Sequence, residues 1–119
     1  MAAAATTPTV EMHFEKSAPE VRATYEAILK ASRALGKVAI EPKKTSIHLV
    51  RESAFAGIAT RKDALILTLK SAAEIRSRRV AKAEQASAKR WHMEFRLTSP
   101  AEVDRELREW LERSWELSD

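Results

Sequence analysis

The chain has 119 residues, a formal net charge of +4 and no cysteine. This length suits one domain that buries its own core. The lack of cysteine excludes a disulfide framework, a thiol nucleophile and a thiolate metal site. No apolar run approaches the roughly 20 residues of a membrane helix, and the N-terminus lacks the regions of a signal peptide. We therefore expect a cytoplasmic protein without a membrane partner, with a disordered tail over residues 1–12 and a single domain over 13–119.

A first helix is predicted to begin at Ser17. Ser17 and Glu20 have the spacing of a capping box, and Pro19 lies in the first turn, where its missing N–H is harmless. Apolar residues then recur at helical spacing as far as Leu35. Gly36 stands where a left-handed residue would end the helix.

Between residues 37 and 98 the apolar period falls to two, which predicts strands at 37–42, 45–51, 54–60, 64–70 and 90–98. The connectors are short, so neighbouring strands are expected to be antiparallel. The segment 71–89 is rich in alanine and favours a helix by propensity, but its apolar positions are too few for a core stripe. This pattern alone does not decide the secondary structure of the segment.

A second helix is predicted after Ser99, because Ser99 and Glu102 repeat the capping-box spacing and an apolar stripe follows from Val103 to Leu117. A sheet with one apolar and one polar face needs cover on the apolar side only. The sequence therefore predicts an α+β fold, with an antiparallel sheet of five to six strands and both terminal helices on one face.

The positive charge is concentrated between residues 70 and 90. Seven basic residues stand there against two carboxylates, and the final helix is acidic. Such a stretch is typical of a nucleic-acid contact, or of a solvated loop that pairs with the acidic helix. No aromatic residue interleaves with the basic ones before Trp91, which argues against base stacking there.

Several catalytic patterns are missing. Two glycines, Gly36 and Gly57, cannot supply a phosphate-binding loop. The three histidines have no metal-ligand spacing, and no serine lies in a hydrolase elbow. We expect no cofactor, no metal and no identifiable catalytic residue.

The polar sheet face offers a candidate site. His48 and His92 are predicted on outward positions, together with Ser46, Thr68 and Lys70, and could form a shallow cationic site for an anion or a proton. The alternative is two half-exposed histidines that share no ligand.

Gly57 in mid-strand indicates a bulge or a close approach to the backbone. Phe55 beside it is interpreted as a core residue.

Short motifs follow one another over residues 13–117: His13-Phe14, Pro-Lys-Lys-Thr at 42–45, Ala-Phe-Ala-Gly at 54–57, Arg-Val-Ala-Lys at 79–82, Trp91-His92, Ser-Pro-Ala-Glu-Val-Asp at 99–104 and Trp110-Leu111. Their order resembles a small bacterial family, the domain of unknown function 5655 (DUF5655). The resemblance implies a strand at 79–84 and places Lys44, Thr45, Phe55, Arg79 and His92 on family motif positions. The chain departs from the family pattern at Ser114-Trp115, and the resemblance brings no activity.

Our leading hypothesis is a non-enzymatic binding module, a monomer or a homodimer joined through an edge strand. Its polar sheet face, with Lys44, His48, Arg79 and His92, would receive a small anion, a peptide or a protein partner. The alternatives are nucleic-acid binding through residues 70–90 and an enzyme that uses His92 as acid or base.

Overall fold

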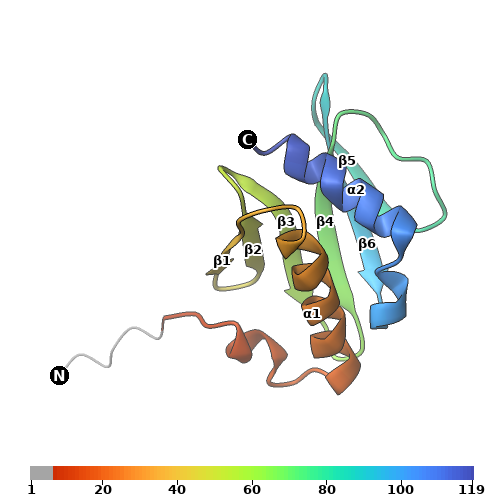
Figure 1. The fold of residues 1–119 in the computed structure, drawn as a ribbon. Coiled ribbons are helices and arrows are strands. Elements are labelled where there is room, and N and C mark those ends of the chain that lie inside the picture. Colours follow the sequence, from red (N-terminus) through yellow and green to blue (C-terminus); the bar gives the residue numbers. More distant parts are fainter. Residues whose placement is uncertain (1–6) are drawn as a thin grey trace.

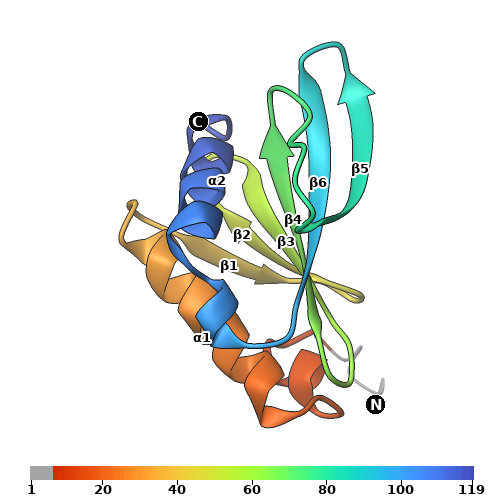
Figure 2. The same cartoon turned by 90° about the vertical axis from the view of Figure 1, so that its right-hand side faces the viewer.

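The computed structural model describes residues 7–119, in which six strands form one antiparallel sheet in the order β1-β2-β3-β4-β6-β5. Two α-helices cover one face of this sheet, and the other face is open (Figures 1 and 2). The strands are β1 (Ala39–Pro42), β2 (Ile47–Val50), β3 (Ala54–Thr60), β4 (Leu65–Ser71), β5 (Val80–Ser87) and β6 (Arg90–Leu97). The α+β prediction is confirmed, and so is the strand that the family resemblance implied within residues 71–89.

Helix α1 (Pro19–Arg33) follows a short 3-10 helix, η1 (Glu11–Phe14). Val10, which the sequence assigned to the tail, packs against the core beside this turn. Residues 1–6 of the predicted tail lie outside the described residues.

The prediction that Ser17 caps the N-terminus of α1 is wrong. The N-cap is Ala18, and the Ser17 hydroxyl donates instead to the carbonyl of Arg61 in the β3–β4 turn, at 2.9 Å. The Ser17 side chain therefore anchors the chain before the helix rather than capping it.

The second helix also begins later than predicted. Ser99 and Glu102 do form a local turn, because the Glu102 carboxylate accepts from the Ser99 N–H at 3.1 Å, but this turn is the 3-10 helix η2 (Pro100–Glu102). Helix α2 (Arg105–Glu116) has Asp104 as its N-cap, which accepts from the Leu107 N–H at 3.0 Å.

The core lies between the helices and the apolar face of the sheet. It is built from alternate residues of β4 and β6, such as Leu67 and Phe95, and from the apolar stripes of α1 and α2, such as Ile28 and Leu107. Each of these four side chains is at most 1% exposed. Burying a side chain of this size stabilises the fold by about 1.5–3 kcal/mol.

A bulge in β3 is closed by a side chain from α2. The β2–β3 register shifts opposite Phe55, so β3 and β4 leave backbone groups without ladder partners there. The buried Ser114 hydroxyl accepts from the Lys70 N–H at 2.9 Å and donates to the Phe55 carbonyl. Ser114 therefore joins α2 to both strands.

The ring of Trp115 covers the turn after α1. A Cβ atom at Gly36 would lie 2.7 Å from Cζ2 of Trp115, so only glycine leaves room for the ring. Gly36 has φ +159°, outside the left-handed helical region, and α1 ends earlier, at Arg33. The expected helix-ending role of Gly36 is therefore replaced by a close packing contact.

Candidate functional site

The open face of the sheet carries a hollow of about 340 Å³ over β3. The chain from residue 54 to 59 forms its floor. Its rim is formed by Ser46 and His48 on one side and by Thr68, Lys70 and His92 on the other.

Small residues of β3 create this hollow. Ala54, Gly57 and Ala59 contribute little or no side chain to its floor. Gly57 pairs with His48 of β2 and with Thr68 of β4. Since neighbouring strands lie about 4.8 Å apart, these two side chains stand about 10 Å apart with no side chain between them.

The rim on the β4 side is cationic. Lys70 Nζ donates to the Ser53 hydroxyl at 3.0 Å. Burial lowers the pKa of Lys70, and the nearby Arg90 lowers it further. A partly desolvated ammonium beside another cation is stabilised when an anion binds.

The two histidines stand at opposite ends of the hollow. Three strand spacings and a register offset of two residues separate His48 from His92, so their backbones lie about 16 Å apart. Both are half-buried, and neither makes a side-chain hydrogen bond within residues 7–119. The same part of the chain holds no group of three His, Asp or Glu side chains that could bind a metal ion.

The nearest carboxylates by register are Glu41, opposite His48, Glu94, opposite Thr68, and Glu84, opposite His92. None of them lines the hollow. Among the lining residues, Lys70 therefore carries the formal charge of the rim.

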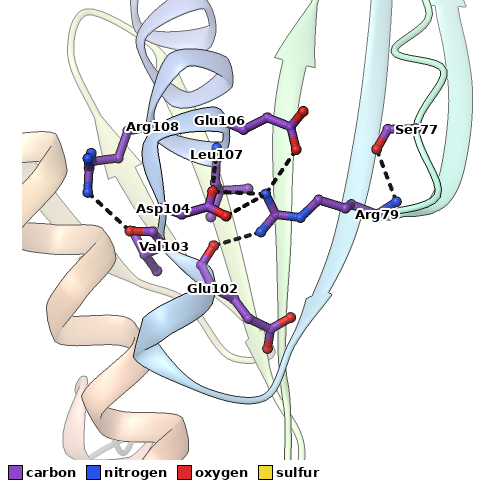
Figure 3. A network of polar contacts seen from close by, with 8 residues as sticks. All are labelled: Ser77, Arg79, Glu102, Val103, Asp104, Glu106, Leu107 and Arg108. Carbon is purple, nitrogen blue, oxygen red and sulfur yellow. Dashed lines mark hydrogen bonds and ion pairs between the residues drawn. The ribbon is translucent and has the colours of Figure 1, made fainter.

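Arg79 lies on the other side of the sheet, against the start of α2 (Figure 3). Its Nη1 atom lies 2.9 Å from Oδ1 of Asp104 and 3.1 Å from Oε1 of Glu106, and Nη2 donates to the Glu102 carbonyl at 2.7 Å. Its guanidinium carbon is 5.8 Å from the centroid of the Trp110 ring. Arg79 is thus bound within the protein, away from His48 and His92.

This network shifts the titration of its members. The pKa of Asp104 is lowered first by the Leu107 N–H and then by Arg79. Burial alone would lower the pKa of Arg79, but the hydrogen bonds to Asp104 and Glu106 outweigh it and raise the pKa. The ion pairs therefore stay charged at neutral pH and stabilise the start of α2.

Phe55 belongs to the floor of the hollow, but its side chain is buried in the core, and Lys44 and Thr45 lie apart from the histidines. Phe55 is 1% exposed and its ring contacts Trp115 edge to face at 5.1 Å, as its interpretation as a core residue expected. Lys44 and Thr45 lie in the β1–β2 loop and line a different cavity of about 640 Å³. Of the six predicted ligand contacts, only the side chains of His48 and His92 share the hollow, and ligand binding by all six stays a prediction.

Residues 10–118 match the family model described as "Domain of unknown function (DUF5655)". The chain belongs to this family. No curated protein and no solved structure gives a significant match to it.

The basic stretch of this DUF5655 domain does not form one surface. Lys70 lines the hollow, Arg79 is paired with α2, and Arg76 pairs with Glu74 at 3.6 Å. The remaining exposed cations are spread along the loop before β5 and the β5–β6 hairpin, which projects beyond the rest of the sheet (Figure 2).

Sequence reasoning missed the cations around Lys44 in this DUF5655 domain. Lys16, Arg61 and Lys62 line the same cavity, although they lie far from Lys44 along the chain. The resemblance noted the motifs at His13 and at Lys44, but a single sequence holds no signal that they meet.

No helix within residues 7–119 is both long and apolar enough to cross a membrane.

Proposed function

We propose that this DUF5655 domain is a non-enzymatic binding module whose open sheet face takes up a small anion with an apolar body. The observation that carries the proposal is the hollow over Gly57, with Lys70 and two histidines on its rim and no carboxylate among its lining residues.

The shape and lining of the hollow favour a compact ligand. Its floor of small residues, Ala54, Gly57 and Ala59, suits a flat apolar group, and its volume of about 340 Å³ lies at the small end of known ligand sites. Lys70 and one histidine stand together at one end, because Lys70 pairs with His92 across the β4–β6 ladder. An aromatic carboxylate combines the two features that this lining favours.

Binding is favoured over catalysis by the placement of the titratable groups. The backbones of His48 and His92 are about 16 Å apart, too far for the two rings to act on the same proton. His92 has no hydrogen-bond partner within residues 7–119 that would orient its ring, as a general base has in catalytic triads. Its nearest rim neighbour by register is a lysine, Lys70, which suits charge recognition.

Nucleic-acid binding through residues 70–90 is supported less well. Arg79 and Arg76, two of its seven cations, are already paired with carboxylates, and Lys70 belongs to the hollow. A phosphate backbone would have to compete with those carboxylates for the guanidinium groups.

A nuclear magnetic resonance titration of the ¹⁵N-labelled protein tests the proposal. Benzoate is the probe, and benzamide is its neutral counterpart. We expect benzoate to shift the amide signals of residues 54–59 and of Lys70, and benzamide to shift them far less, because it lacks the charge.

Three variants locate the site. Lys70→Gln should weaken benzoate binding about tenfold, the effect of losing one charge-assisted hydrogen bond. Gly57→Val should block it, because the new side chain enters the hollow, where a Cβ atom meets nothing closer than 3.7 Å. Lys89→Gln removes the same charge from the exposed β5–β6 turn and should leave binding unchanged.

Equal shifts with benzoate and benzamide would disprove recognition of the charge. Equal weakening in Lys70→Gln and Lys89→Gln would show that benzoate senses only the net charge. Shifts confined to residues outside the hollow would refute the site itself.

A further inference from the structure

A second cationic cavity lies at the end of the sheet where η1, the β1–β2 loop and the β3–β4 turn meet. It measures about 640 Å³ and does not share a lining residue with the hollow over Gly57. Its charged lining residues are Lys16, Lys44, Arg61, Lys62 and a single carboxylate, Glu15.

The four cations of this cavity lack carboxylate partners. Within residues 7–119 none of them forms an ion pair, although Lys43 beside them pairs with Glu41 at 3.3 Å. All four are exposed, and Arg61 donates to a backbone carbonyl rather than to a carboxylate. With Glu15 as the single carboxylate among them, the cavity keeps an excess of positive charge that water and anions from solution stabilise.

Hydrogen bonds hold the three segments in place. His13 Nε2 lies 2.8 Å from the Lys43 carbonyl, and the Thr60 hydroxyl donates to the His13 carbonyl. The backbone N–H of Ala18 donates to the Lys62 carbonyl at 2.7 Å. The cations thus stand on fixed backbone, which reduces the ordering needed when a ligand binds.

The geometry points to a compact oligophosphate as the ligand. We propose that this cavity, which we call the lysine cleft, binds a chain of phosphate groups, either free or as the phosphates of a nucleotide. Several like charges around one concavity match a group that carries several negative charges at close spacing. The volume of the cavity lies within the usual range of small-ligand pockets. Its lining has no Phe, Tyr or Trp side chain on which the bases of a single strand would stack.

Isothermal titration calorimetry at low salt tests this proposal on the full chain. The probes are tripolyphosphate, adenosine triphosphate and a short oligothymidylate. We expect the first two to bind with a stoichiometry of one, with affinity falling as salt is raised. Equal affinities for tripolyphosphate and adenosine triphosphate would show that the phosphate chain alone is sufficient for binding. Tighter binding of adenosine triphosphate would show that the ligand is a nucleotide.

Two double variants locate the site. Lys44→Gln/Lys62→Gln should weaken tripolyphosphate binding by at least about tenfold, through the loss of two charge-assisted contacts. Lys82→Gln/Lys89→Gln removes the same charge from β5 and its hairpin turn and should leave binding unchanged. All four lysines are exposed, so a thermal melt should find both variants as stable as the parent protein.

Equal weakening in both double variants would overturn the lysine cleft in favour of a net-charge effect. Binding of the oligothymidylate alone would overturn the compact-ligand part of the proposal. Absence of heat with both phosphate probes, together with unchanged amide signals around the cleft, would overturn it entirely.

Discussion

The two glycines of the chain should respond to alanine in opposite directions. Gly57 lies in the middle of β3, where a Cβ atom would meet only Cβ of Thr68, at an ordinary 3.7 Å. At Gly36 the same atom would lie 2.7 Å from Cζ2 and 3.1 Å from Cη2 of Trp115. Gly57→Ala should therefore stabilise the protein, and Gly36→Ala should destabilise it.

The magnitudes follow from these distances. Glycine inside a strand is less stable than alanine by about 0.5–1 kcal/mol, and nothing at Gly57 offsets that gain. Overpacking at Gly36 should cost about 1–3 kcal/mol, because the Trp115 ring is held against Phe55 and cannot move freely. For a domain of this size, Gly57→Ala should raise the Tm by about 2–4 °C and Gly36→Ala should lower it by about 4–12 °C.

Differential scanning calorimetry and urea denaturation measure both values. The paired design controls for composition, because each variant adds one methyl group. Shifts of the same sign in both variants would refute the reasoning. A Gly36→Ala protein as stable as the parent would mean that the Trp115 ring is free to move aside.

Two further variants test buried and charged contacts. Ser114→Ala should lower the free energy of unfolding by about 1–3 kcal/mol in urea denaturation, because it leaves the Lys70 N–H and the Phe55 carbonyl unpaired. The control Ser87→Ala changes an exposed serine and should alter stability by less than about 0.5 kcal/mol. Equal losses in the two variants would contradict a stabilising role of the Ser114 hydrogen bonds. The pKa of Asp104 is lowered in the folded state, so its stabilisation is present at neutral pH and is lost as the pH falls below about 4. Thermal melts at neutral and acidic pH should therefore differ less for Asp104→Asn than for the parent protein, and an unchanged difference would exclude this contribution.

The sheet was predictable from the sequence because the alternation of apolar and polar residues shows which side chains of a strand face the core. In β6, Met93 and Phe95 are buried while His92 lies on the opposite face, as the period of two requires. The edge strand β5 was not predictable in this way. It buries little surface, so its side chains show no clear alternation, and its assignment depended on the family resemblance.

The positions of the candidate site residues could be predicted only where the alternation within a strand determined which face of the sheet they occupy. His48 and His92 were placed correctly on the open side of the sheet. Arg79 was grouped with them because the family resemblance placed it on a motif position, but the carboxylates at the start of α2 hold it on the helix side. Lys44 joins the lysine cleft through contacts between segments far apart in the chain, and no local pattern records such contacts.

The two borders of the sheet leave little room for another strand to join. At one border β1 is four residues long and ends in Pro42, which has no N–H to offer. At the other, the pairing of β5 with β6 has two register shifts, and β5 exposes Lys82 and Glu84. These features disfavour the addition of further strands, so a concentrated solution of this protein should resist fibril growth.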